Sequence, residues 1–325
     1  MTVCVAALAT WVDEDNVPQP AVILAADRMI TSRGATETEY EQLDKTKLMW
    51  LDSPDPERPD SQTVALIVSG NLDDLEIIGQ NATLEIKEDG VTLISDMAEV
   101  YARHHQSYRL KKVERDYLGK YGLTMVEFIE KQQDLRQSFF DRIDNNIRSY
   151  QSDIGEVIIA GIDKFGGHIF SVDDDGVYPC TATGFAAIGI GADFAEIEFT
   201  SVMYTSYTQW LDAMVIGYFA KKNAERAPGV GSATDLWWIL PDGHRYRAPQ
   251  DKEVTTLEAI YKNRRATEYK LITEGADIIG NLLVKEGFAY AQRVSGDQPG
   301  TEGGQVPGDQ EEGVSKGPEA GESEG

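Results

Sequence analysis

The chain opens with the stretch Met1-Thr2-Val3-Cys4-Val5-Ala6-Ala7-Leu8-Ala9, and a second apolar run follows at Ala21-Val22-Ile23-Leu24-Ala25-Ala26-Asp27-Arg28. A short apolar run without polar alternate positions indicates a strand that is buried on both faces, because neither face offers polar groups to water. The two runs are separated by the polar turn at 13–16. We therefore predict two core strands, 2–10 and 21–27, at the start of the fold.

Thr2 is a candidate nucleophile at the start of the chain. Removal of Met1, which a small second residue permits, leaves Thr2 with a free α-amino group beside its hydroxyl, at the start of a core strand. Such a residue is a nucleophile with its own general base attached. The alternative is that Met-Thr simply precedes a strand, as it does in many chains.

Several further motifs follow Thr2 in a fixed order. They are Leu24-Ala25-Ala26-Asp27-Arg28-Met29-Ile30-Thr31, Asp44-Lys45-Thr46-Lys47-Leu48, 65–74, 157–163, 168–176 and 187–191. In this order the chain resembles the proteasome β-subunit family of N-terminal nucleophile hydrolases, including bacterial relatives of the ancestral-β-subunit kind. The resemblance covers roughly residues 2 to 243.

The distribution of strands and helices predicts the fold class. Strand patterns at 2–10, 21–27, 46–51 and 63–69 precede a helical block, and others follow it at 156–162, 168–172, 185–190 and 234–240. Strand clusters that are followed by helices fit an α+β fold, in which two antiparallel sheets stack face to face between helical layers. The resemblance implies the same four-layer αββα sandwich.

The helical block itself is long. We predict helices from Asn71 onward and over roughly 91–150, with a break at 117–124 and an N-cap at Thr124, and later over 195–224 and 253–286. The block at 91–150 exceeds the helical pair that is usual in the family. Its excess, about 106–140, is a subunit contact, a cap over the site or an ordinary surface hairpin. A two-residue turn is expected at Gly166-Gly167.

Composition sets the domain organisation and excludes several functions. We expect one hydrolase domain over 1–294, followed by a disordered acidic tail at 295–325 that is rich in Gly, Glu and Pro. The net charge of −25 disfavours nucleic acid and anionic membranes as partners. Two cysteines, no secretory leader pattern and no long apolar run predict a cytoplasmic protein without a disulfide framework.

Four residues are candidates for catalysis. The Thr2 hydroxyl is the nucleophile, and its α-amino group, with an unperturbed pKa of about 7.7 to 8.0, is the base. The resemblance implies that Lys47 is the catalytic lysine, although Lys45 lies on the same strand face, and that Asp27 orients it. The backbone N–H of Gly70 is the candidate oxyanion donor, since glycine lets a carbonyl approach closely. An ordinary surface lysine and a turn aspartate are the alternatives.

The substrate side of the site also follows from the resemblance. Thr31 would bind an extended substrate backbone, and the pocket for the residue before the cut would be lined by Ile30, Met49, Val68 and Leu72. The alternative is that these four apolar residues are core positions.

The chain departs from the family pattern at its polar supports. It has Gly189-Ile190-Gly191-Ala192 where the family has serines, and Arg226-Ala227-Pro228-Gly229-Val230-Gly231 where an aspartate and a serine support the N-terminal amine. Loss of such supports leads to slow proton transfer or an inert subunit.

Three functions remain open at this stage. The first is a threonine peptidase that acts on polypeptides as a homo-oligomeric ring, with a separate ATP-dependent unfoldase as a further partner. The second is a catalytically silent β-type subunit, and the third is an amidase for small amides. No metal-ligand cluster or nucleotide-binding loop is present in the sequence, so we expect no metal and no cofactor.

Overall fold

The computed structural model describes residues 2–33, 37–41, 46–52, 62–150, 152–241, 243–248 and 252–285. For 30–33, 37–41 and 283–285 it describes the backbone alone. The chain forms two compact units, 1–263 and 264–325, and the first contains both five-stranded sheets. The predicted tail at 295–325 lies outside the described residues.

The two opening runs form the centre of the first sheet. β1 (Cys4–Val12) pairs antiparallel with β2 (Pro18–Asp27) from Cys4↔Ala26 to Val12↔Pro18. The sheet order is β10-β1-β2-β11-β12, and its other strands are β10 (Phe185–Ile188), β11 (Thr234–Ile239) and β12 (Arg245–Arg247). This pairing places Thr2, just before β1, beside Asp27 at the end of β2.

The second sheet has the order β5-β6-β7-β8-β9 and is also antiparallel. Its strands are β5 (Leu48–Asp52), β6 (Val64–Gly70), β7 (Gly155–Asp163), β8 (Gly166–Val172) and β9 (Val177–Pro179). A separate hairpin consists of β3 (Met29–Arg33) and β4 (Glu37–Glu41).

Alternate side chains of β1 face different layers, which explains why the run is apolar throughout. Cys4, Ala6 and Leu8 pack between the two sheets, against residues of the second sheet such as Ile67 and Ile158. The alternate residues of β1, which begin at Val5, pack against helices instead. A strand that is covered on both faces needs no polar side chain.

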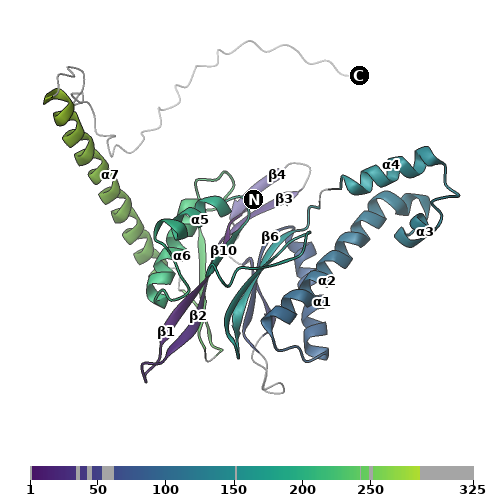
Figure 1. Cartoon of the computed structure of the whole chain (residues 1–325), viewed down its shortest axis with the longest axis horizontal. Helices are drawn as coiled ribbons and strands as arrows, with labels where there is room; N and C mark the ends of the chain where they lie inside the picture. Colours follow the sequence, from purple (N-terminus) through teal and green to yellow (C-terminus); the bar gives the residue numbers. More distant parts are fainter. Residues whose placement is uncertain are drawn as a thin grey trace, which may run out of the picture. The chain divides into compact units, whose positions relative to one another are not determined.

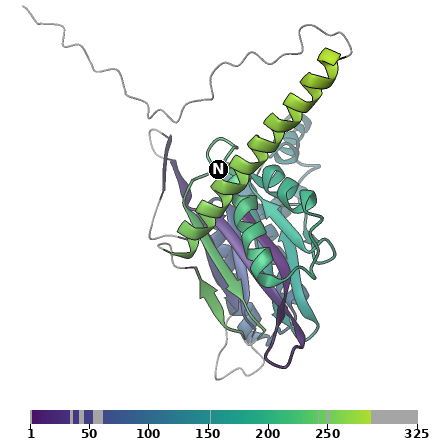
Figure 2. The same cartoon turned by 90° about the vertical axis from the view of Figure 1, so that its left-hand side faces the viewer.

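Helices cover the outer face of each sheet (Figure 1). The first sheet is covered by α5 (Ala192–Ser201), α6 (Trp210–Ala224) and the start of α7 (Glu253–Lys285), and Figure 2 looks onto this layer. The second is covered by α1 (Leu72–Glu88) and α2 (Ile94–Val113). The predicted four-layer αββα sandwich is confirmed.

The region after α2 forms a small helical subdomain. It contains η1 (Glu114–Leu118), η2 (Gly119–Tyr121), α3 (Met125–Glu130) and α4 (Gln137–Arg148). The predicted caps are present, since Asn71 accepts a hydrogen bond from the backbone of α1 and Thr124 forms a capping box with Glu127. Leu118, Phe128 and Ile143 form a core of their own.

Two local predictions were wrong. Asp163 pairs with Gly166, so the β7–β8 turn consists of Lys164 and Phe165, and the two glycines belong to β8. The helix predicted over 195–224 is divided into α5 and α6 at 202–209, where Met203 has a φ of +50°. Among the described helices, none is both long and apolar enough to cross a membrane.

Candidate active site

Thr2 is held in place by its own backbone. Its residue surface is only 4% exposed, and its carbonyl accepts a hydrogen bond from the Gly191 N–H at 3.3 Å. Gly189 packs against the same carbonyl with a φ of +88°, and a Cβ there would lie 2.5 Å from the oxygen. Only glycine fits this position, so the 189–191 loop fixes Thr2 at the edge of the first sheet.

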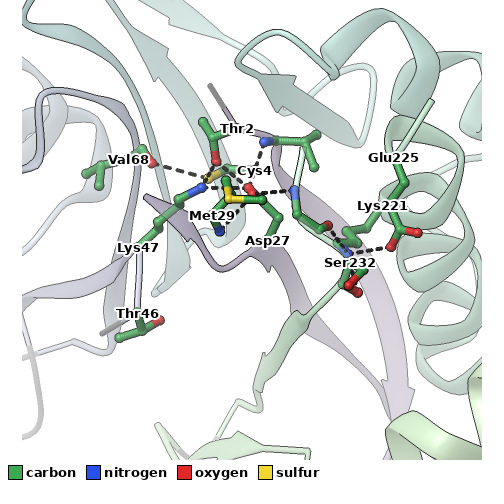
Figure 3. A network of polar contacts seen from close by, with 12 residues as sticks. Thr2, Cys4, Asp27, Met29, Thr46, Lys47, Val68, Lys221, Glu225 and Ser232 are labelled. Atoms are coloured by element: carbon green, nitrogen blue, oxygen red, sulfur yellow. Dashed lines mark hydrogen bonds and ion pairs between the residues drawn. The ribbon is translucent and has the colours of Figure 1, made fainter. Parts of the chain in front are cut away.

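Asp27 is the centre of the polar network in Figure 3. Its carboxylate is completely buried, so each of its lone pairs needs a donor. Oδ1 accepts from the Thr2 hydroxyl, from Lys47 Nζ at 2.7 Å and from the Val3 N–H at 2.9 Å, and Oδ2 accepts from the N–H groups of Met29 and Gly231, each at 3.0 Å. With five donors, the carboxylate is held ionised and in one orientation.

Lys47 lies one residue before β5 and reaches across from the second sheet. Its buried Nζ donates hydrogen bonds to Thr2 Oγ1 and to Asp27 Oδ1. The fold thus brings together the three predicted residues Thr2, Asp27 and Lys47, although Thr2 and Lys47 are 45 positions apart in the sequence. Lys45, the alternative lysine, lies outside the described residues.

The electrostatics favour a charged pair beside the hydroxyl. Burial raises the pKa of Asp27, but the charge and hydrogen bond of Lys47, together with the donors at Thr2 and Val3, outweigh it and hold the pKa below its usual value. Cys4 is the other nucleophile nearby, and burial raises its pKa to about 12. Its thiol donates to the Val68 carbonyl at 3.3 Å, so Cys4 is inert at neutral pH.

Gly70 ends β6 opposite Gly155 and has a φ of +145°. A Cβ on Gly70 would lie 2.3 Å from the Ile154 carbonyl, so the close approach of the two strands requires glycine there. The preceding residue, Ser69, lies next to the Gly189 loop that holds Thr2, because a Cβ on Gly189 would lie 2.8 Å from Ser69 Oγ. Gly70 therefore follows directly on a residue that borders the site.

Three of the predicted pocket residues share one apolar cluster. Val68 is completely buried in it, whereas Met49 and Leu72 are half-buried and pack against it. Met49 and Leu72 are therefore the two with surface left for a ligand. Ile30 and Thr31 lie on β3, and their side chains are outside the described residues.

A second polar cluster, not predicted from the sequence, is connected to Asp27 through Gly231. The ammonium of Lys221 on α6 is completely buried and donates to Glu225 Oε1 at 2.6 Å, the Gly231 carbonyl at 2.8 Å and the Ser232 carbonyl at 2.9 Å. Gly231 in turn donates to Asp27. No sequence signal marks Lys221, which lies in the run Gly217-Tyr218-Phe219-Ala220-Lys221-Lys222 of α6.

Apolar residues occupy the positions where the resemblance expected polar supports. Ile190 is 52% exposed, Ala227 is buried, and Val230 packs against the core between the first sheet and its helices. A Cβ on Gly191 would meet Val230, Ala224 and Val3. The contacts to the site come from backbone groups of the two loops, since the Gly191 N–H donates to the Thr2 carbonyl and the Gly231 N–H donates to Asp27.

The part of the chain that the structure describes contains no group of three His, Cys, Asp or Glu side chains arranged to hold a metal ion. The site described above consists of a hydroxyl, an ammonium, a carboxylate and backbone donors.

Comparison with known proteins bears on the fold. No protein-family model matches the chain, and no curated protein matches it. Among solved structures it is similar to Anbu, the ancestral β-subunit, from Yersinia bercovieri, with a TM-score of 0.55 and 14% identity over 84% of this chain and 96% of that one. At this identity the likeness shows that the two chains share a fold.

Proposed function

We propose that the chain is a threonine hydrolase, and specifically a peptidase, whose nucleophile is Thr2 after removal of Met1. The observation that carries this proposal is the contact of the Thr2 hydroxyl with both Lys47 and Asp27 in a buried site. A threonine that is buried for packing alone needs no ion pair at its hydroxyl. A positioned ammonium beside it favours loss of the hydroxyl proton.

The proposed reaction uses only groups of this chain. The α-amino group of Thr2 accepts the hydroxyl proton, and Oγ1 attacks the amide carbonyl to form a tetrahedral intermediate. The Gly70 N–H donates to the oxyanion, and the amine leaving group takes the proton. Water then hydrolyses the acyl-enzyme ester and restores Thr2. Lys47 stabilises negative charge on Oγ1, and Asp27 holds Lys47 in place.

The substrate and partners belong to the same proposal. A polypeptide would bind in extended form along Thr31, with an apolar side chain at Ile30, Met49 and Leu72, while the buried Val68 supports this pocket from within the core. Copies of the chain would assemble into a ring, in the cytoplasm, fed by a separate ATP-dependent unfoldase. The negative charge supports the absence of nucleic-acid and anionic-membrane partners. The proposed chemistry requires no cofactor.

Mass spectrometry of the purified protein before and after a peptide epoxyketone tests this proposal. We expect loss of Met1 and a covalent adduct on Thr2. Thr2→Ala should still fold but lose turnover and adduct, whereas Thr2→Ser, which retains a hydroxyl, should keep measurable turnover. Full activity in Thr2→Ala would exclude Thr2 as the nucleophile.

One observation favours a second candidate, a catalytically silent β-type subunit. The apolar side chains at Ile190, Ala227 and Val230 leave the N-terminal amine without the side-chain supports that the resemblance expects. This candidate predicts a large particle in light scattering and no adduct on Thr2. Turnover of small amides but not of peptides would instead indicate an amidase.

A further inference from the structure

We propose that Lys221 is a positioning residue for the Thr2 site, which it serves by fixing the backbone loop whose Gly231 N–H binds Asp27. This inference rests on the proposed function, because it assigns a role within the same site. Lys221 lies on α6, beyond the first sheet, and touches neither Thr2 nor Lys47 in the network of Figure 3.

The surroundings of Lys221 indicate a dedicated structural contact. An ammonium has three protons, and Lys221 Nζ has three acceptors, namely one carboxylate oxygen and two successive backbone carbonyls. The whole side chain is buried. Burial of a lysine is costly unless every donor is satisfied, so an apolar residue would pack α6 against the sheet more cheaply.

One of the two carbonyls that Lys221 binds belongs to Gly231, which connects Lys221 to Asp27. Gly231 uses its carbonyl to accept from Lys221 and its N–H to donate to Asp27 Oδ2 at 3.0 Å. Lys221 therefore holds one side of a peptide segment whose other side binds the carboxylate of Asp27. Asp27 in turn contacts Lys47 and the Thr2 hydroxyl. This connection runs from α6 to the Thr2 hydroxyl through three consecutive hydrogen bonds, from Lys221 to Gly231, from Gly231 to Asp27 and from Asp27 to Thr2.

The loop needs such a clamp. It follows the turn at Ala227-Pro228-Gly229, and its side chains at Ala227 and Val230 are apolar. Because these side chains give Asp27 no polar contact, its orientation on this side depends on the Gly231 backbone. We infer that the lysine on α6 takes over the supporting role that polar loop side chains would otherwise have.

The charged groups that face Lys221 come from two elements. Lys222 lies on α6 and Glu225 is the C-cap residue of this helix, and Asp27 lies across the loop on β2. Burial lowers the pKa of Lys221, while the negative charges of Glu225 and Asp27 oppose this effect. Asp27 is also faced by Lys47, Thr2 and Cys4. Removal of Lys221 therefore stabilises the charged form of Asp27 less and raises the pKa of this carboxyl.

The test compares Lys221→Met with Lys222→Met. Methionine fills a similar volume without donors, and Glu225 keeps a partner because Lys222 Nζ lies 2.7 Å from its Oε2. Lys222→Met removes an equal charge one residue along, next to Glu225 and Glu258 but away from the loop. We expect Lys221→Met to lower kcat about tenfold with KM unchanged, since misplaced catalytic groups cost rate rather than binding. Lys222→Met should leave kcat unchanged.

The second readout is the pKa of Asp27 from the ¹³C resonance of its carboxyl carbon, assigned by its absence in Asp27→Asn. In Lys221→Met the Gly231 N–H should move away from Asp27, and the loss of this donor to a charged group should raise the pKa of Asp27 by about one unit. Lys222→Met should not raise it. An unchanged Asp27 pKa or an unchanged kcat in Lys221→Met overturns the proposal.

Two arrangements keep this test decisive. If Lys221→Met does not fold, the double variant Lys221→Met/Glu225→Gln, which removes the charge of both partners, is measured in its place. If the unmodified protein has no turnover and no adduct on Thr2, the proposed hydrolase function fails by that result. The Asp27 titration in the variants then decides on Lys221 alone.

Discussion

At the scale of single residues, the site depends on one completely buried carboxylate. Asp27 accepts from two side chains and three backbone N–H groups, and the Lys47 ammonium forms an ion pair with it. A buried charge is tolerated only when it is paired and fully hydrogen-bonded. Asp27 is therefore both the positioning group of the site and a determinant of stability whose effect depends on pH.

Asp27→Asn tests this double role. The pKa of Asp27 is lowered in the folded chain, so its stabilising effect is present above the unfolded pKa of about 3.9 and is lost as pH falls through the lower folded value. We expect Asn to leave Lys47 buried without a counter-charge, to cost about 3 kcal/mol at neutral pH and to abolish turnover.

Urea unfolding between pH 7 and pH 3 measures the effect. The free energy of unfolding should fall more steeply below about pH 4 in the unmodified protein than in Asp27→Asn. The control is Asp15→Asn in the exposed turn before β2, which should retain the slope of the unmodified protein. Equal slopes in Asp27→Asn and the unmodified protein would contradict the assigned ion pair.

At the scale of elements, the site exists only where the two sheets meet. β1 and β2 supply Thr2 and Asp27 from the first sheet, and the start of β5 supplies Lys47 from the second. The apolar layer between the sheets, which includes Cys4 and Ile67, therefore sets the distance between the Thr2 hydroxyl and the Lys47 ammonium. Packing of this layer is a condition for the proposed catalysis as well as for stability.

The helical subdomain at 114–150 is a different kind of element, because its core of Leu118, Phe128 and Ile143 is separate from the core layers of the sandwich. Phe128→Ala should destabilise this subdomain locally by about 3 kcal/mol. Hydrogen exchange should show lost protection over 114–150 and unchanged protection in β1, β2 and β6. Val126→Ala on the same helix is the control, since Val126 is exposed. Loss of protection in the sheets would show that the subdomain is part of the main cooperative unit.

At the scale of the whole molecule, the sequence predicts the strands that have a long apolar run. Local patterns predict strands β1, β2, β6 and β7 and the caps of α1 and α3. The contact between Thr2 and Asp27 could be predicted only with the strand pairing that the resemblance implies. The edge strands β9 and β12 were missed because strands of three mostly exposed residues are too short to show a periodicity. Lys221 was missed because its role depends on the loop that folds against it.

Charge is the property of the whole chain that bears on the proposed assembly. Residues 295–325 contain eight acidic residues and one basic residue, which contribute a large share of the net charge of −25. Copies of such a chain repel one another at low ionic strength, and salt screens this repulsion over roughly 10 Å at 0.1 M.

We expect light scattering to show larger particles at about 0.5 M salt than at about 0.05 M. A chain that ends at Val294 should assemble at lower salt than the full chain, because less charge must be screened. The same salt dependence for both chains would exclude the tail as the source of repulsion, and a single copy at every salt concentration would contradict the proposed ring.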